Sequence, residues 1–432
     1  MLKLHPPQFV TNVLSRLKNA GHQAYIAGGA VRDACLGRRT TDWDVTTSAS
    51  AMEIKTLFSD TPLFTLKHET VTLVDAGRHY EVTPYRGRKK DIRDDLAHRD
   101  FTLNAMAYDP EKIEILDFHN GKKDITRKLI KATGEPKARF SEDPVRLLRA
   151  VRLAAEFDFT IEINTMDAMK EMASTLRSVS PERSRDELIK VLMCPRPSTG
   201  LKLMRRTGFL KYILPELLEG YLKRQNACHQ YTVFRHIMET IDRVEPDPVM
   251  RLTALFHDIA KPRVRKKIGG DWKFYGHAQA GAEMAEEIMR RLRFSKDMIQ
   301  KTTNLIRYHM IDYGSEWTDG AVRRLIRRVG SRQINSLLTL READILAHGL
   351  HCQKLDPLIE LRERITKLLK KPVITTPRDL AIDGHRVMQI LGITSGPEVG
   401  IILKKLVEKV TDTLELNTEE SLVTVLMDLR KE

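Results

Sequence analysis

Strand patterns in this chain are confined to its first part. Short apolar runs predict β-strands at residues 24–27, 71–74, 80–83 and 113–117. After about residue 140 such runs fade, and apolar residues recur at helical spacing over residues 142–157, 164–176, 181–193, 198–207 and from 230 to the end. Helices are also predicted at residues 1–22 and 31–36. The sequence therefore predicts an α/β head followed by an all-α remainder.

Prolines punctuate the helical remainder in two places. Pro195, Pro197 and Pro215 mark residues 195–225, and Pro372 and Pro377 mark residues 352–378. A chain of 432 residues has the length of about two to four domains. We therefore expect four domains, which are a head at 1–140, a helical neck at 141–225, a helical body at 226–352 and a helical tail at 353–432.

The chain is strongly basic, with a net charge of +14. Such a charge favours a polyanionic partner such as nucleic acid, although a merely solvated surface would give the same value. Aromatic residues make up only 6% of the chain, which disfavours a single-strand binder built from base-stacking platforms.

Composition also bears on the compartment. No long apolar run predicts a membrane span, and the N-terminal residues MLKLHPPQFV lack the pattern of a secretory signal. The cysteines form no CxxC pair, so neither a disulfide framework nor a zinc knuckle is predicted. We expect a cytoplasmic protein with no membrane partner and with reduced cysteines at positions 35, 194, 228 and 352.

The stretch from Ile26 to Thr47 carries the first chemical signal. Gly28 and Gly29 follow a predicted strand and precede a predicted helix, which suits the close approach of a phosphate to the backbone. Asp42 and Asp44 are two residues apart, so in a strand both carboxylates would lie on one face. Paired carboxylates suit Mg²⁺, which keeps substrate phosphates among its ligands.

The order strand, Gly-Gly, helix with Arg-Asp, and DxD resembles the DNA polymerase β nucleotidyltransferase superfamily. Within it, the chain resembles the family of class II tRNA nucleotidyltransferases and bacterial poly(A) polymerases. The resemblance implies a polymerase-β-type mixed sheet in the head and catalysis by Asp42 and Asp44 with Mg²⁺ as the cofactor. It also implies a triphosphate site that is formed by Gly28, Gly29, Arg32 and Asp33.

Two further head motifs are similar to that family. The segment HRDFTLNAMAY at residues 98–108 resembles a block whose Arg-Asp and Asn contact the incoming nucleotide, which implies this role for Arg99, Asp100 and Asn104. His98 stands where the family usually has arginine. Residues 117–124 resemble a DxxxGxxD block that joins head to neck, although a plain turn explains this pattern equally well.

The neck contains a candidate template for the base. Residues 142–152, EDPVRLLRAVR, resemble the family motif EDxxRxLRAxR. A carboxylate can accept from cytosine N4 while a guanidinium donates to N3 and O2, so Asp143 and Arg146 would select the base. Arg149 and Arg152 would hold phosphates. The alternative is an ordinary salt bridge on a solvated helix.

A second neck motif has a structural role in the family. Residues 180–188 resemble the block ERxxxEL, which implies support of the neck by Glu182, Arg183 and Glu187.

One segment bears on the product. In the family, enzymes that add a full CCA carry a flexible loop between the strand ending in YEVTPYR and the segment DLAHRD. Here only GRKKDIRD, residues 87–94, lies between them, which indicates a deletion. We therefore expect addition of CC from CTP to tRNA, with a separate enzyme adding the adenosine. A complete CCA product, which also uses ATP, and a poly(A) product remain open.

The body contains a second candidate site. Its residues follow the order H…HD…H…H…D, which resembles the HD phosphohydrolase domain. Such a mixed N/O ligand set suits a transition metal such as Mn²⁺, Fe²⁺ or Ni²⁺. The resemblance implies RNA 2′,3′-cyclic or 3′-phosphates as substrates, with a metal-bound water as the nucleophile. A centre that only stabilises the body is the alternative. The expected ligands are His236, His257, Asp258, His277, His309 and Asp344.

Basic residues recur in the helical part and would contact the tRNA backbone, although such runs also form solvated faces. They are Lys261, Arg263, Arg265, Lys266, Lys267, Arg323, Arg324, Arg327, Arg328 and Arg332. Residues 378–400 resemble a C-terminal segment of bacterial members and suggest no chemistry. A non-catalytic RNA-binding protein is a third reading, which the DxD pair disfavours.

Overall fold

The computed structural model describes residues 4–40, 42–65, 69–349, 355–371, 374 and 376–429. The chain forms two compact units, residues 1–213 and 214–432. The neck end expected at residue 225 therefore lies inside the second unit. The boundary expected at residue 352, together with Cys352 and Pro372, lies outside the described residues.

A seven-stranded sheet forms the core of the head, with the strand order β3-β4-β5-β2-β1-β6-β7. Only β2 and β5 pair in parallel among the described strands of this sheet, so the mixed sheet predicted for the head is confirmed. The strands are β1 (Ala24–Ala27), β2 (Asp44–Thr47), β3 (Leu63–Thr65), β4 (Val71–Asp75), β5 (Arg78–Pro84), β6 (Ala107–Asp109) and β7 (Glu114–Leu116).

The four strands predicted from apolar runs correspond to β1, β4, β5 and β7. β3 and β6, each of three residues, were not predicted. β2 begins at Asp44, so Asp42 lies before the strand rather than within it.

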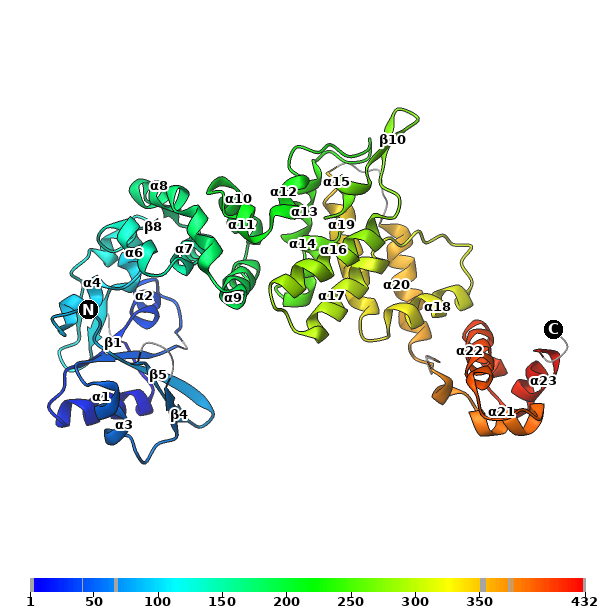
Figure 1. Ribbon diagram of the computed structural model, residues 1–432, viewed down its shortest axis with the longest axis horizontal. Helices are drawn as coiled ribbons and strands as arrows, with labels where there is room; N and C mark the ends of the chain where they lie inside the picture. Colours follow the sequence, from blue (N-terminus) through cyan, green and yellow to red (C-terminus); the bar gives the residue numbers. More distant parts are fainter. Residues whose placement is uncertain are drawn as a thin grey trace. The chain divides into compact units, whose positions relative to one another are not determined.

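Helices α1 and α3 pack beside the sheet, near β1 and β4 (Figure 1). The helix predicted over residues 1–22 is shorter in the structure, because Pro7 has extended backbone angles and α1 starts only at Gln8. The head helices are α1 (Gln8–Asn19), α2 (Gly29–Cys35), α3 (Ala51–Leu57), α4 (Ile92–Ala97) and α5 (Gly121–Thr126).

The neck is a small helical layer in which α7 packs against α9 and α10. The single helix predicted over 142–157 is wrong at its start. Asp143 has extended angles (φ −151°) and precedes Pro144, which begins a new helix. The neck helices are α6 (Pro136–Glu142), α7 (Val145–Phe157), α8 (Ile163–Glu171), α9 (Pro181–Leu192), α10 (Pro197–Arg206) and α11 (Leu210–Ile213).

In the second unit, helices α13, α14, α16, α17 and α19 lie side by side (Figure 1). Their apolar faces meet in a core that also contains buried polar groups, discussed below. The helices of the body are α12 (Pro215–Glu219), α13 (Val233–Ile241), α14 (Pro248–Phe256), α15 (Lys261–Val264), α16 (His277–Arg291), α17 (Lys296–Tyr308), α18 (Asp319–Val329), α19 (Ile334–Leu346) and α20 (Asp356–Leu368).

The prediction of an all-α remainder is wrong at one place in the body. Strands β10 (Lys266–Ile268) and β11 (Asp271–Lys273) form an antiparallel hairpin. Gly269 and Gly270 both have positive φ, 59° and 82°, which is the geometry that a two-residue hairpin turn requires. The lysines of this segment suggested a solvated basic run and hid the strand pattern. A short two-stranded pair, β8 (Leu129–Ile130) with β9 (Thr160–Ile161), also enters the neck.

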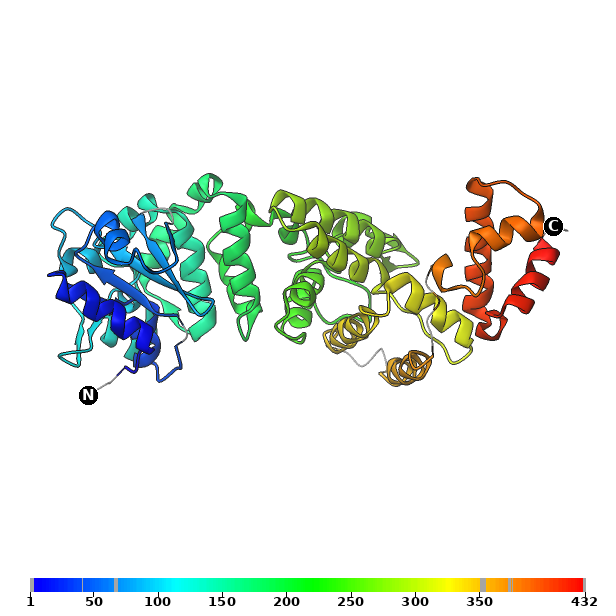
Figure 2. The same cartoon turned by 90° about the horizontal axis from the view of Figure 1, so that it is seen from below.

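The last three helices, α21 (Gly384–Leu391), α22 (Pro397–Asp412) and α23 (Glu419–Leu429), pack on one another around their own apolar cluster, which includes Val387, Leu406 and Leu422 (Figure 2, orange to red). Among the described residues, no helix combines the length and the apolar character needed to cross a bilayer.

Candidate functional site

Three carboxylates meet at the edge of β2 in the head. Asp44 is the first residue of β2, and Asp42 precedes it by two positions. The parallel register that pairs Val45 with Val82 places Glu81 of β5 next to Asp44. Sequence reasoning did not assign Glu81. Its partner strand lies about 37 residues away in the chain, and pairing between distant strands has no local sequence signal.

These carboxylates repel one another. Burial raises the pKa of Asp44, and the neighbouring charges of Asp42 and Glu81 raise it further, to about 7. Burial and Asp42 likewise raise the pKa of Glu81. Such a crowded set of oxygen ligands is relieved by a hard divalent cation, so the residues fit Mg²⁺.

Gly28 lets a basic side chain reach this carboxylate set. Its φ is +73°, which disfavours other residues. A Cβ at this position would lie 2.9 Å from Arg99 Nη1 and 3.5 Å from Asp44 Oδ2. The structure therefore brings Gly28, Arg99 and Asp44 together, as the motifs predicted.

A fully buried carboxylate, Asp95, holds Arg99 in place. Arg99 Nη2 donates to Asp95 Oδ2 at 3.2 Å, and Thr46 Oγ1 donates to the same oxygen at 3.1 Å. The backbone N–H of Arg86 donates to Asp95 Oδ1 at 3.1 Å. Asp95 thus links β2, the end of β5 and the segment at residues 98–108, which is called the nucleotide motif below. Sequence reasoning gave it no role.

A chain of hydrogen bonds connects the remaining predicted residues of the head to the neck. Arg32 donates to Asp33 and to Asn104, both at 2.9 Å. Asn104 Nδ2 donates to Asp100 Oδ1 at 3.0 Å, and Arg149 Nη1 donates to Asp100 Oδ2 at 3.0 Å. Burial raises the pKa of Asp100, but Arg149 and Asn104 lower it more, so the net shift is downward. Arg149 is 44% exposed and remains accessible to a ligand.

The two residues predicted to select the base lie at the start of α7 but do not pair with each other. Asp143 accepts from Arg183 Nη2 at 2.6 Å. Arg146 donates to Glu142 Oε2 at 2.9 Å and to the carbonyl of His98 at 3.4 Å. Arg183 therefore touches the candidate base-selecting carboxylate directly.

Arg152, also on α7, connects two helices of the neck. Its Nε donates to Glu187 Oε2 at 2.9 Å, and Nη1 donates to Glu156 Oε2 at 3.4 Å. Both acceptors belong to the neck, so Arg152 bridges α7 and α9. Among the predicted supporting residues, Glu187 makes this contact.

The block at residues 117–124 anchors α5 beneath the nucleotide motif. Asp117 accepts from the N–H groups of Gly121 and Lys122 at 2.7 and 2.9 Å. Thr102 Oγ1 donates to Asp124 Oδ2 at 2.7 Å. A Cβ at Gly121 would collide with the backbone carbonyl of Thr102, so glycine is required by close packing here.

In the body, the six predicted ligands lie together in the interior. They form two groups that share one aspartate, namely His236, His257, Asp258 and Asp344, and Asp258, His277 and His309. His236 and His257 Nε2 lie 3.3 Å from Asp258 Oδ2, whereas His277 Nε2 lies 3.5 Å from Asp258 Oδ1.

The imidazoles are oriented as metal ligands are. In His257, His277 and His309, Nδ1 lies 2.7 to 2.8 Å from a backbone carbonyl and must carry a proton, so Nε2 is the nitrogen that faces the cluster. The Nε2 atoms of His277 and His309 are only 3.3 Å apart. Two lone pairs at this distance without a proton between them indicate a place for a cation.

Charged groups surround this cluster. Lys261 Nζ lies 2.7 Å from Asp258 Oδ2, and Arg341 Nη1 donates to Asp344 Oδ2 at 2.5 Å. Burial lowers the pKa of His257, but Asp258 and Asp344 raise it more, to about 10. Burial lowers the pKa of His309, to about 3, and that of His277. The mixed imidazole and carboxylate donors of the cluster fit a transition metal ion. A pocket of about 380 Å³, rimmed by Trp272, Phe274 and Tyr275, opens onto it.

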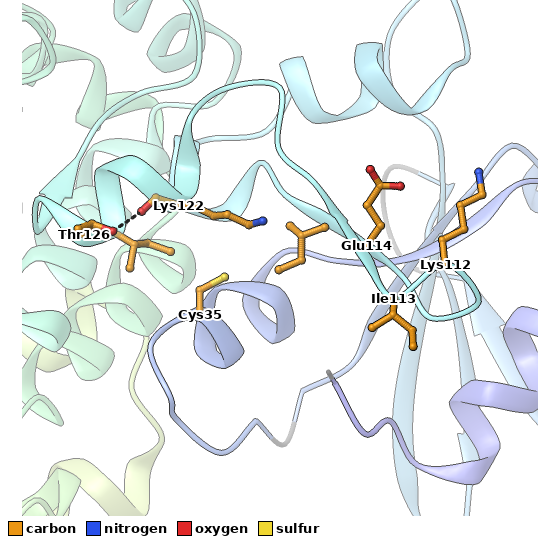
Figure 3. A pocket seen from close by; sticks show the side chains of 8 residues that line it. Cys35, Lys112, Ile113, Glu114, Lys122 and Thr126 are labelled. Carbon is orange, nitrogen blue, oxygen red and sulfur yellow. Dashed lines mark hydrogen bonds between the residues drawn. The ribbon is translucent and has the colours of Figure 1, made fainter. Parts of the chain in front are cut away.

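Another pocket lies in the head, away from the carboxylates. It has a volume of about 760 Å³ and is lined by Cys35, Lys112, Glu114, Lys122 and Thr126 among others (Figure 3). None of the predicted site residues lines it. Its lining includes the thiol of Cys35, and burial raises the pKa of this thiol.

Several residues of the predicted basic runs have local partners. Arg263 donates to Glu219 at 2.7 Å, and Arg265 lies 3.3 Å over the ring of Trp272. Arg324 pairs with Asp412 of α22. Lys261 is buried, so it does not belong to a solvated face.

Comparison with known proteins agrees with these features. Residues 24–131 match the family described as "Poly A polymerase head domain", residues 158–220 match "Probable RNA and SrmB- binding site of polymerase A", and residues 272–426 match "tRNA nucleotidyltransferase domain 2 putative".

Two relatives and one solved structure cover most of the chain. The CC-adding tRNA nucleotidyltransferase of Thermus thermophilus is 32% identical over 89% of each protein. The CCA-adding enzyme of Streptococcus thermophilus is 29% identical over 97% of this chain and 96% of its own length. The crystal structure of the Bacillus stearothermophilus CCA-adding enzyme in complex with CTP matches 99% of this chain and 98% of its own, with a TM-score of 0.75 and 25% identity. At this identity and coverage, the chain belongs to the CCA-adding family of tRNA nucleotidyltransferases and is a nucleotidyltransferase.

Proposed function

We propose that the protein adds two cytidines from CTP to the 3′ end of tRNA and stops before the adenosine. The observation that carries this proposal is the closed turn between β5 and α4. A complete CCA product and a poly(A) product are the rival outcomes, and a CC product would require a separate A-adding enzyme.

The segment at residues 87–94 folds back on itself. Gly87 has φ +91°, and a Cβ there would collide with the Asp94 carboxylate. The backbone N–H of Lys89 donates to Asp94 Oδ2 at 2.8 Å, and Asp91 caps α4 by accepting from the Asp94 N–H at 2.7 Å. A turn tied at both ends leaves no room for the flexible loop that full CCA addition is expected to need.

Transfer of the nucleotide is assigned to the head carboxylates. We propose that Asp42, Asp44 and Glu81 hold Mg²⁺, which supplies charge neutralisation for the attacking hydroxyl and the leaving pyrophosphate. Arg99, held by Asp95, and Arg32, held by Asp33 and Asn104, are placed to bind the triphosphate. Gly28 and Gly29 leave space for it. Arg149 extends this positive surface into the neck.

Base selection is assigned to Asp143 and Arg146. Asp143 would accept from cytosine N4, and Arg146 would donate to N3 and O2. Because Arg183 already holds Asp143 at 2.6 Å, it would keep this carboxylate oriented. Arg152 could contact a phosphate only after its hydrogen bond to Glu187 is broken.

The proposal is tested with a tRNA that ends at the discriminator base, incubated with Mg²⁺ and with CTP, ATP or both. Two added nucleotides with CTP, unchanged when ATP is present, are expected. A third nucleotide in the presence of ATP would show a full CCA enzyme, and a ladder with ATP alone would show a poly(A) polymerase. Asp42→Asn serves as the control that must abolish extension.

A second candidate function, hydrolysis of RNA 2′,3′-cyclic or 3′-phosphate ends, is favoured by the gathering of the six body ligands around Asp258. A transition metal ion there would supply Lewis acid chemistry for phosphate esters. Hydrolysis should survive Asp42→Asn and be lost in Asp258→Asn. If both variants retain the full rate, the activity does not belong to this centre.

A further inference from the structure

Two histidines outside the predicted ligand set lie against the body centre. His229 lies in the segment before α13, and His348 follows α19. Their rings are 4.1 Å apart between centroids, and each lies 5.3 Å from the ring of His236. One nitrogen from each of the three rings falls within 4.8 Å of the other two. A third imidazole pair therefore adjoins the two pairs already described.

The pair is placed by contacts that resemble those of the other ligands. His229 Nδ1 lies 2.5 Å from Asn226 Oδ1, which leaves Nε2 as the unprotonated nitrogen. His348 Nε2 lies 3.6 Å from Asp344 Oδ1. Arg341 occupies the other carboxylate oxygen, Oδ2, so Oδ1 of Asp344 is turned toward the imidazoles.

Polar atoms of this pair are buried without partners. His348 is 3% exposed, and its Nδ1 has no hydrogen-bond partner. His229 Nε2 is likewise buried and unpartnered. A buried imidazole nitrogen without a partner destabilises the fold unless something binds it. A cation bound to His229 Nε2 would satisfy that atom, whereas apolar packing would not.

We propose that His229 and His348, with Asp344, form an additional transition-metal position beside the two ligand groups that share Asp258. Imidazole nitrogen favours Zn²⁺, Co²⁺ or Ni²⁺ over Mg²⁺. Asp344 would bridge this ion and the neighbouring one through Oδ1, as Asp258 faces two histidine pairs through its two oxygens. The three histidine pairs would then form one row, joined by two aspartates.

The position is independent of the head chemistry, so the test counts ions rather than tRNA products. The chain is prepared with Asp42→Asn and Asp44→Asn, which silence the head carboxylates. Co²⁺ is added alone, weakly bound ion is removed, and the metal per chain is measured by mass spectrometry together with visible absorption. The variants are His229→Gln with His348→Gln, His229→Gln alone, and His385→Gln as an exposed control on α21.

We expect the double variant to bind one Co²⁺ fewer per chain and to lose part of the absorption band, while His385→Gln leaves both unchanged. The single variant His229→Gln removes only a half-buried ring, so the chain should still fold. It should raise the Kd of the last-bound Co²⁺ at least tenfold. An unchanged ion count and affinity in these variants would overturn the proposal while leaving the Asp258 centre standing. If the parent chain binds no Co²⁺ at all, the Asp258 centre fails as well.

Discussion

At the scale of single residues, the head is governed by the mutual repulsion of its carboxylates. Asp44 is the most affected, because it is next to both Asp42 and Glu81. The motif residues could be predicted since their chemistry is tied to close spacing in the chain. Glu81, Asp95 and the contact from Arg183 could not, because their partners lie far away in sequence; Arg183 and Asp143 are 40 residues apart.

The raised pKa of Asp44 leads to a pH-dependent stability. Its pKa is about 7 in the folded chain and 3.8 ordinarily. Between these values the folded chain keeps a proton that the unfolded chain has released. Stability therefore falls as pH rises through this window, and the penalty is complete above pH 7. Asp44→Asn should stabilise the metal-free chain by about 2–4 kcal/mol at pH 8 and by little near pH 4.

Denaturant unfolding at both pH values, with and without Mg²⁺, measures this difference. Mg²⁺ should reduce it, because the ion binds the ionised parent and not the variant. An Asn variant that is less stable than the parent at pH 8 without metal would contradict the assigned repulsion.

Arg183 gives a prediction about base selection. Arg183→Gln removes the guanidinium that holds Asp143, and this half-exposed pair should contribute only about 0.2–1 kcal/mol to folding. The value of kcat/KM for CTP should nevertheless fall about tenfold, or about 1.4 kcal/mol. Arg185→Gln, which removes a local pair with Asp186 on the same helix, is the control. Equal kcat/KM values in the two variants would remove Arg183 from the selecting site.

At the scale of elements, local signals located most helices but not their ends. Pro7 delays the start of α1, and Pro144 splits the predicted neck helix so that Asp143 becomes extended. The β10–β11 hairpin was missed because lysines dominate its strands and only the Gly-Gly turn marks it. Local propensity cannot show such features when charge masks the alternation.

The packing of α5 under the nucleotide motif gives a further prediction. Gly121→Ala would push α5 away from the carbonyl of Thr102 and from Met106 Cγ, which would lie 2.9 Å from the new Cβ. We expect a loss of about 1–3 kcal/mol in stability and a lower rate of nucleotide addition, because Thr102 and Asn104 share one turn. Gly400→Ala, with open space around it in α22, should be neutral or stabilising. Equal unfolding midpoints for both variants would contradict this packing argument.

At the scale of the whole molecule, the sequence predicted the α/β head, the mostly helical remainder and the family. The four domains stay a prediction, and by contacts the chain groups into two units, residues 1–213 and 214–432. Such grouping depends on apolar faces that meet in space, and proline positions alone do not report it. The six candidate ligands of the body could be singled out in the sequence because their order is distinctive, but the third histidine pair belongs to no motif.

Metal removal should affect the two units differently. A chelator should lower the unfolding temperature of the second unit, because its buried candidate ligands bind the ion only in the folded chain. The free energy of unfolding should fall by about 2.7 kcal/mol when the free ion had been present at about 100 times its Kd. Asp258→Asn should reduce this sensitivity, and Asp42→Asn should leave it unchanged. Scanning calorimetry checks the prediction, and an undiminished chelator effect in Asp258→Asn would place the ion away from Asp258.

The central claim, that the closed turn at residues 87–94 limits the product to CC, is tested most directly with a tRNA that already ends in CC. The tRNA is incubated with the protein, Mg²⁺ and ATP, and its 3′ ends are sequenced. A chain without the flexible loop should leave the CC end unextended, although the same preparation adds CC to the shorter tRNA. Addition of a single adenosine at a comparable rate would contradict the claim and make this a full CCA-adding enzyme.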